Sequence, residues 1–249
     1  MGKKSEKEFL INSYFVDENR DLTMPNLMCF FQEVAWEHVN NNNCGWDFLR
    51  QFDVFWAVIR FRIIVNRTPK WNEKIRIVTW GKPVERIVHP RDFEVYDEEG
   101  NKIIIATSAW LILDVNTFKP REVHFEGEDE VRVNEHAIRE SIPRTPRIEP
   151  VNKSRIKQVL FSDLDMNRHV NNTRYLLWIL DNFSQEFHKT HVMKECIINF
   201  VTQAMWGMDY YLIQEEIEPN VFVTNILAAD DDRELCSVQT VWAERNESH

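Results

Sequence analysis

Glycine is scarce in this 249-residue chain, and its six copies lack the spacing of a phosphate-binding loop or a dinucleotide-binding fingerprint. The sequence also has no Gly-x-Ser-x-Gly motif, which forms the nucleophile elbow of many serine hydrolases. Basic residues are outnumbered, since 30 Lys and Arg against 40 Asp and Glu give a formal net charge of −10. A dedicated nucleic-acid-binding domain is usually basic. These absences disfavour nucleotide-binding enzymes, serine hydrolases of this type and nucleic-acid-binding proteins.

Paired cysteines and long hydrophobic runs are missing too. No Cys-x-x-Cys pair occurs, so neither a zinc site nor a disulfide framework is expected. The histidines show no ligand spacing, and we expect no metal and no cofactor. No stretch approaches the roughly 18 apolar residues of a membrane span, and residues 1–8 lack the apolar core of a signal peptide. The sequence therefore predicts a cytoplasmic protein with reduced thiols and no membrane span.

The first half of the chain reads as one helix followed by strands. Residues 22–39 carry Leu27 and Phe31 at helical spacing, with Thr23 as the predicted N-cap and Pro25 in the first turn. Strand-like runs follow at residues 54–65, 74–80, 92–96 and 102–113. Alternation in the first run predicts a single face made of Phe55, Ala57, Ile59, Phe61 and Ile63. This pattern predicts a helix and an antiparallel meander.

The second half of the chain repeats the first. At a shift of 146 residues, Phe15-Val-Asp17 matches Phe161-Ser-Asp163, and a second helix is predicted over residues 171–187. At a shift of 135 residues, Trp71 matches Trp206. The matches keep their order along the chain, which indicates two copies of one helix-then-sheet unit.

A proline-rich stretch separates the two copies, because four of the nine prolines lie within residues 120–150. We therefore predict an N-terminal unit at 1–119, a linker at 120–150 and a C-terminal unit at 151–249. A long helix followed by an antiparallel sheet is buried when the sheet curls around it, as in the hotdog fold. The expected fold class is α+β, with two such units in tandem.

Polar side chains gather just before the second predicted helix. Asp165, Asn167 and His169 lie at i, i+2 and i+4, which in an extended segment places all three on one side. The helix N-terminus predicted at Asn171 and Asn172 offers unpaired backbone N–H groups that can polarise a carbonyl oxygen. Such a set can activate water and stabilise an oxyanion. The structural alternative is that Asp and Asn only cap the helix and form a turn.

The first copy lacks an imidazole at this place. At the shift of 146 residues, the counterparts of the three polar residues are Asn19, Asp21 and Thr23. The repeat therefore predicts one site per chain, in the C-terminal unit, with His169 as its titrating group.

The run from Ser162 to Tyr175, Ser-Asp-Leu-Asp-Met-Asn-Arg-His-Val-Asn-Asn-Thr-Arg-Tyr, closely resembles the signature of the acyl-acyl carrier protein thioesterases of plants and bacteria. The segments Arg67–Trp71, Arg91–Phe93 and Ala109–Thr117 agree with the same family. This resemblance implies a double hotdog fold and hydrolysis of the thioester between a fatty acyl chain and the phosphopantetheine arm of acyl carrier protein. It also implies catalytic roles for Asp165, Asn167 and His169.

The chain departs from the family at one pair of residues. The family has Glu and Cys in the next strand, whereas this chain has Gln203 and Ala204. An amide cannot act as a general base, although Gln203 can still orient water or His169. Ala204 excludes a covalent thiol mechanism at that position, and Cys196 is expected in the core. We therefore expect direct attack by water, and the sequence leaves open whether Asp165 or His169 takes the proton.

The expected product is a free fatty acid, released in fatty acid biosynthesis. Two alternatives stay open, an acyl-CoA thioesterase and a non-catalytic acyl-binding protein. Both a monomer and a homodimer are compatible with a tandem unit. The densest basic cluster is formed by Arg144, Arg147, Lys153, Arg155 and Lys157, and it is compatible with a solvated surface, which is the usual role of such clusters, or with docking of the acidic carrier.

Overall fold

The computed structural model describes residues 3–42, 44–124, 131–149, 151 and 153–245. The chain divides into two compact units, Met1–Ile142 and Pro143–His249. Part of the stretch 120–150 packs on the first unit, where the Val133 N–H donates to the Gly81 carbonyl at 2.9 Å and the Val133 side chain contacts Val78 and Trp80. No helix among the described residues is long and apolar enough to cross a membrane.

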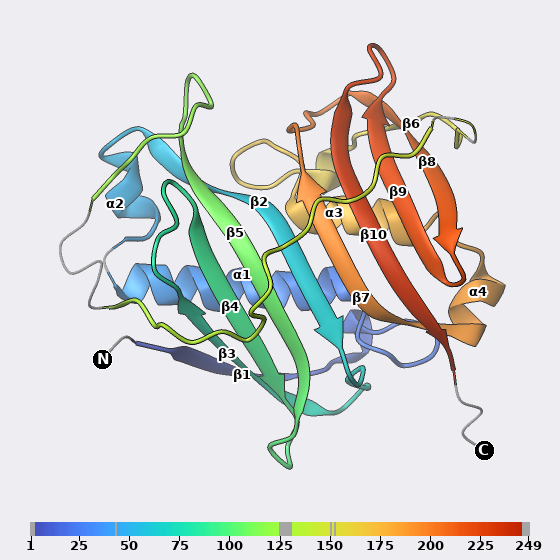
Figure 1. The fold of residues 1–249 in the computed structure, drawn as a ribbon, viewed down its shortest axis with the longest axis horizontal. Helices are drawn as coiled ribbons and strands as arrows, with labels where there is room; N and C mark the ends of the chain where they lie inside the picture. The colour runs from blue at the N-terminus through green and yellow to red at the C-terminus, as the bar shows by residue number, and fades with distance from the viewer. Residues whose placement is uncertain (1–2, 43, 125–130, 150, 152, 246–249) are drawn as a thin grey trace. The chain divides into compact units, whose positions relative to one another are not determined.

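The first unit is an antiparallel sheet with a long helix against it (Figure 1). Its strands are β1 (Ser5–Leu10), β2 (Val54–Val65), β3 (Lys74–Gly81), β4 (His89–Tyr96) and β5 (Lys102–Asp114). They pair in the order β1-β3-β4-β5-β2. The helices are a 3-10 turn (Ser13–Phe15), α1 (Met24–Asn41) and α2 (Trp46–Arg50). The predicted helix and the four predicted strands are therefore present, but the predicted meander holds only for β3, β4 and β5, because β2 pairs with β5 and not with β3.

Helix α1 begins and packs as its sequence predicts. The Thr23 side chain accepts a backbone N–H of the first turn, and Pro25 lies in that turn. The buried face presents Phe31, whose ring lies 5.8 Å from that of Phe61 on β2 and 4.5 Å from that of Phe93 on β4. Aromatic pairs at such distances add about 1 kcal/mol each beyond the area they bury. The sheet therefore holds α1 through its aromatic stripe.

Strand β2 does not keep one face throughout. Its register against β5 shifts between Val58 and Arg60, which is the mark of a β-bulge. Beyond the bulge, Phe61 and Ile63 are buried as predicted, whereas Ile59 is only half-buried. The predicted uninterrupted row was wrong because the bulge inserts one residue and changes the alternation.

The second unit repeats the same topology (Figure 1). Its strands are β6 (Lys157–Gln158), β7 (His191–Phe200), β8 (Asp209–Glu218), β9 (Val221–Ala228) and β10 (Glu234–Glu244). They pair in the order β7-β10-β9-β8-β6. In both units the strand after the helices pairs with the last strand, and the strand before the helices pairs at the far edge. The shared order supports the internal repeat.

The helix predicted over residues 171–187 is divided in two. A 3-10 turn (Phe161–Asp163) is followed by α3 (Asn172–Leu180) and α4 (Gln185–Thr190). The Ser184 side chain accepts the Phe187 N–H at 3.1 Å, and this cap starts the second helix. Packing of α3 on the sheet includes the Trp178 ring, 4.1 Å from that of Tyr210.

Candidate active site

A tight turn, rather than an extended segment, carries the predicted catalytic residues. The turn spans residues 164–170 and is closed by the Asp165 N–H, which donates to the His169 carbonyl at 2.8 Å. The Arg168 N–H donates to the Asp165 carbonyl at 3.0 Å, and Arg168 has a φ of 65°, in the left-handed region. The reversal brings Asp165, Asn167 and His169 together, but through a turn and not through the alternation of a strand.

The Asp165 carboxylate organises this turn. Its Oδ1 accepts the backbone N–H of Asn167 at 2.8 Å and that of His169 at 3.2 Å. Its Oδ2 lies 3.5 Å from the Asn167 amide nitrogen. The carboxylate thus has the structural role that Asp often takes in turns, and it also places a negative charge beside His169. Asp165 therefore fits both the structural and the catalytic interpretation of the motif.

His169 is half-buried at the end of the turn. Burial lowers the pKa of His169 below its ordinary value of 6.5, and the Asp165 charge offsets this only in part. The imidazole is therefore mainly neutral near pH 7 and has a ring nitrogen that can accept a proton.

Gln203 and Ala204 lie directly beside the turn. The Ala204 carbonyl accepts the Val170 N–H at 3.1 Å, and Met205 forms a β-bridge with His169. Gln203 is half-buried, and Ala204 is fully buried. The fold therefore brings the predicted Gln203 next to the catalytic turn, although 34 residues separate it from His169 in the sequence.

Tyr175 fixes the segment of Gln203 and Ala204, which lies between β7 and β8 and not in a strand as predicted, and it was not singled out as a site residue from the sequence. Its buried hydroxyl accepts the Ala204 N–H at 3.0 Å from helix α3. Burial raises the pKa of Tyr175 above its ordinary value, so the hydroxyl stays protonated. Tyr175 is therefore a positioning residue, and the only signal for it in the sequence is its place at the end of the run Ser162–Tyr175.

The helix N-terminus offers fewer free donors than predicted. The Asn171 N–H donates to the Asp163 carbonyl at 2.8 Å, and the Asn171 side chain caps α3 by accepting the Thr173 N–H at 3.0 Å. Among the hydrogen bonds of the described residues, none uses the Asn172 N–H. Of the two predicted oxyanion donors, Asn172 is therefore the one with an open backbone amide.

The first unit contains the same turn. Asp17 Oδ1 accepts the N–H of Asn19 at 2.8 Å and that of Asp21 at 3.0 Å. The Asp17 N–H donates to the Asp21 carbonyl at 2.9 Å, and Arg20 has a φ of 61°. The hydrogen bonds of residues 164–170 are thus repeated at residues 16–22.

This equivalence corrects the predicted register of the repeat. The two turns are related by 148 residues, not 146, because their hydrogen bonds and their preceding 3-10 turns align only at that shift. The structural counterparts of Asp165, Asn167 and His169 are Asp17, Asn19 and Asp21. Thr23 is the counterpart of the Asn171 cap. The inference that His169 has no imidazole counterpart is unchanged.

Asp21 has a structural partner in place of a catalytic one. It is buried, forms a β-bridge with Lys70 and lies 2.5 Å from the Lys70 ammonium group. In the second unit, the residue equivalent to Lys70 is Met205, which cannot pair with a charge. The first turn is therefore closed by an ion pair, whereas the second carries a titratable ring.

Cysteine chemistry finds no support at this turn. Cys196 is fully buried, and burial raises its pKa above the ordinary thiol value, so the reactive thiolate is disfavoured. No group of metal ligands is found within the part of the chain that the structure describes. Proton transfer and hydrogen bonding are the chemistry that these side chains supply.

Known proteins match the chain over most of its length. Residues 2–131 match the acyl-ACP thioesterase N-terminal domain, and residues 148–244 match the acyl-ACP thioesterase C-terminal domain. The oleoyl-acyl carrier protein thioesterase 2, chloroplastic, of Arabidopsis thaliana is 27% identical over 266 residues, which cover 100% of this chain and 71% of the relative. A relative from Coriandrum sativum, oleoyl-acyl carrier protein thioesterase, chloroplastic, is 25% identical and covers 92% of this chain and 67% of its own.

Solved structures agree with the fold. An acyl-ACP thioesterase from Bacteroides thetaiotaomicron superposes with a TM-score of 0.89 at 25% identity and covers 96% of this chain and 98% of its own. The 12:0-ACP thioesterase from Umbellularia californica superposes with a TM-score of 0.89 at 20% identity and covers 98% of this chain and 99% of its own. The predicted α+β tandem hotdog fold is confirmed. The chain belongs to the acyl-ACP thioesterase family.

Proposed function

We propose that this protein hydrolyses the thioester of fatty acyl-acyl carrier protein and releases the free fatty acid. The family match over both units supports the reaction class. The observation that carries the proposal is the turn at residues 164–170, which repeats the turn of the first unit but replaces Asp21 by His169. An imidazole kept neutral by its surroundings is the group that attack by water requires.

In the proposed mechanism, His169 accepts a proton from water as the water oxygen bonds to the thioester carbonyl carbon. Asp165 Oδ1 is already occupied by two amides, so we assign the proton to the His169 ring and give Asp165 the role of stabilising the imidazolium. The open Asn172 N–H at the start of α3 donates to the oxyanion. Collapse of the intermediate breaks the C–S bond, and His169 returns the proton to the departing thiolate.

Asn167 and Gln203 complete the proposal as orienting groups. Asn167 lies within the turn, 3.5 Å from Asp165 Oδ2, and presents its amide beside the reacting centre. Gln203 takes the place of the acidic residue of the family and orients the attacking water without accepting its proton. No cofactor and no covalent enzyme intermediate are needed.

The test is hydrolysis of two thioesters of equal chain length, acyl-acyl carrier protein and acyl-CoA. Release of fatty acid and free thiol, faster from the carrier than from CoA, is the expected result. Faster hydrolysis of acyl-CoA would favour an acyl-CoA thioesterase, and acyl binding without hydrolysis would favour a binding protein. The cytoplasmic location stays a prediction, as does the choice between monomer and homodimer.

A further inference from the structure

Exposed apolar side chains surround the turn of the second unit. The exposed fractions are 57% for Leu160, 83% for Phe161, 79% for Met166, 44% for Met205 and 71% for Trp206. Single apolar residues on a surface are ordinary, but a contiguous group is typical of a contact site. We call these five residues the turn patch.

Backbone hydrogen bonds hold the members of the turn patch on adjoining segments. The Val159 N–H donates to the Met208 carbonyl at 2.9 Å, and the Gly207 N–H donates to the Val159 carbonyl at 3.1 Å. On the other side, Met205 forms a β-bridge with His169. Residues 205–207 thus lie between the segment that leads to Leu160 and the catalytic turn, and the patch borders His169.

The first unit shows that the turn itself does not require these side chains. The equivalent positions, at shifts of 148 residues for the turn segment and 135 for the segment that bridges to it, are Asn12, Ser13, Glu18, Lys70 and Trp71. Only the tryptophan is retained, and the other four are polar or charged. The same backbone therefore folds without apolar side chains at four of these five positions, so the turn itself does not require them.

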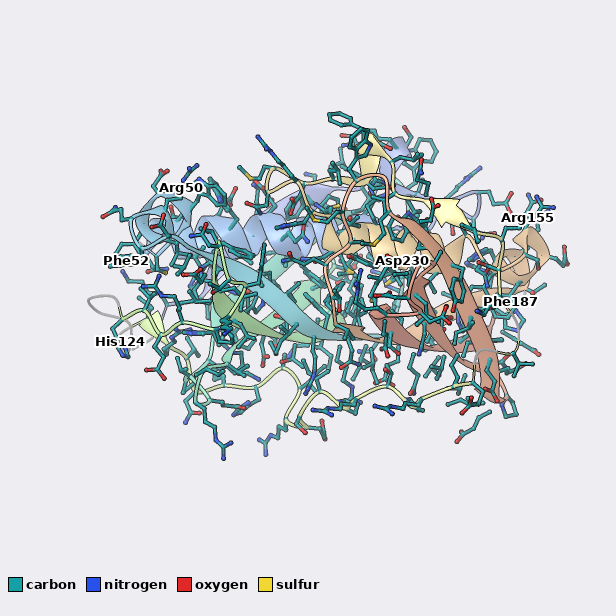
Figure 2. The ribbon with its side chains drawn as sticks, turned by 90° about the horizontal axis from the view of Figure 1, so that it is seen from above. Arg50, Phe52, His124, Arg155, Phe187 and Asp230 are labelled. Carbon is teal, nitrogen blue, oxygen red and sulfur yellow. The ribbon has the colours of Figure 1, made fainter. Side chains whose placement is uncertain are left out.

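Basic side chains flank the turn patch in a protein whose net charge is −10. Arg168 is exposed on the turn, two residues after Met166, whereas Arg174 on α3 lies 4.0 Å from Asp163 and donates to the Ser162 carbonyl at 3.0 Å, so its charge is already used within the unit. Arg155 and Lys157 precede Leu160, and Arg155 lies at the periphery of the second unit (Figure 2). The exposed Asp209 beside β6 is bound by the Gln158 amide at 3.2 Å. An apolar centre with cations around it complements an acidic surface that has apolar side chains of its own.

The basic cluster predicted from the sequence contributes only in part. Lys153 lies 3.6 Å from Asp232 and 4.4 Å from the centre of the Tyr211 ring, so its charge is already used within the unit. Lys157 is the member nearest the turn patch along the chain, three residues before Leu160. The exposed cation on the catalytic turn itself, Arg168, was not part of the predicted cluster.

We propose that the turn patch, with Arg168 on the turn and Lys157 three residues before Leu160, docks acyl carrier protein through an acidic surface of the carrier. This inference rests on the proposed function, because docking beside His169 delivers the phosphopantetheine-linked thioester to the turn. Substrates without the carrier do not use the patch. The members outside the turn at residues 164–170, such as Leu160 and Phe161, therefore govern binding of the carrier and not the chemical step.

The test is direct binding of holo acyl carrier protein without an acyl chain, measured by calorimetry at low and moderate salt. The double variant Leu160→Asn, Phe161→Ser introduces the residues that the first unit has at these positions and leaves the catalytic turn at residues 164–170 unchanged. We expect its Kd to rise about 10-fold or more, and a similar rise for Arg168→Glu, with the contribution of Arg168 weakening as salt is added. The control Tyr14→Ser, at an exposed aromatic residue of the first unit, leaves the Kd unchanged.

The hydrolysis assay separates the two proposals. With docking at the patch, the double variant has a raised KM for acyl-acyl carrier protein and unchanged turnover of acyl-CoA. Unchanged affinity in both patch variants, or no binding of the carrier by the wild-type protein, would overturn the docking proposal. So would loss of a dimer in the double variant, because the occupant would then be a second copy of this chain. Carrier binding that depends on the patch, without any hydrolysis, would instead overturn the proposed function alone.

Discussion

The two turns at residues 16–22 and 164–170 share one backbone and differ in what they present. Both are closed by the same hydrogen bonds around an aspartate, and both lead into a capped helix. In the first, Asp21 is buried against Lys70, whereas in the second His169 is half-buried and neutral. The same turn backbone therefore serves two roles. With Asp21 it forms a structural ion pair, and with His169 it presents a group for proton transfer.

Removal of the imidazole gives the largest expected effect. We expect His169→Ala to lower kcat about 10³-fold, because a positioned general base is worth roughly 10²–10⁴-fold. The matched change in the first turn, Asp21→Ala, lowers stability by removing the partner of Lys70 and leaves kcat within a few-fold of wild type. Steady-state hydrolysis and urea unfolding of both variants measure the contrast. Equal losses of kcat would mean that the two turns do not differ in role.

The buried histidine of the first unit is expected to affect stability and not turnover. The His38 ring nitrogens are held by the Lys3 carbonyl at 3.0 Å and by the Arg91 guanidinium at 3.1 Å. Burial, helped by the Arg91 charge, lowers the pKa of His38 from 6.5 to about 4. The unfolded chain then binds the proton first, so stability falls as the pH drops from about 6.5 to 4, by up to about 3 kcal/mol.

Urea unfolding at pH 7 and pH 5 measures this loss, and His38→Gln is the variant that reduces it. A free energy of unfolding with the same pH dependence in wild type and variant would show that His38 is not responsible.

The two turn aspartates separate charge from structure. Asp165→Asn and Asp17→Asn both keep an oxygen that can accept the two turn amides, so we expect small and similar changes in melting temperature. Only Asp165→Asn removes a charge beside the imidazole, and we expect its kcat to fall about 10²-fold. Thermal unfolding and hydrolysis assays test this pair. A large kcat effect from Asp17→Asn would contradict the division of roles.

A gain of activity is expected from Gln203→Glu, which restores an acid at the position where the family has one. A second carboxylate near His169 stabilises the imidazolium, and we expect an increase in kcat of up to about 10-fold. Gln51→Glu makes the same charge change at an exposed position of the first unit and serves as the control. No increase, or a decrease, would show that Gln203 itself is adapted to orient the water.

Much of this comparison can be predicted from the sequence. The Thr23 cap, the strand bounds and the repeat follow from local periodicity and turn residues. The signature around His169 identifies the catalytic turn before any contact is known. The pattern Asp-x-Asn-Arg, at residues 17–20 and 165–168, is also visible and would have given the shift of 148 residues.

The remaining features depend on contacts between distant segments. The match of Phe15 with Phe161 gave a repeat shift of 146 residues, two fewer than the structural shift of 148. Identical side chains do not show which backbone groups are hydrogen-bonded. The approach of Ala204 to Val170, and its support by the Tyr175 hydroxyl, are set by how α3 and the following strands pack. A sequence pattern of period 2 predicts alternation, but a tight turn can bring the same residues together in another way.

The central claim is that a neutral His169 ring takes the proton from water. It is tested most directly by titrating the His169 ring with NMR and measuring kcat/KM for acyl-acyl carrier protein over the same pH range. Because burial lowers its pKa, the ring should lose its proton below pH 6.5, and kcat/KM should rise with pH through the same midpoint. In Asp165→Asn both midpoints should move to lower pH, since the carboxylate raises the pKa. A rate profile that does not follow the titration of His169 would contradict the claim.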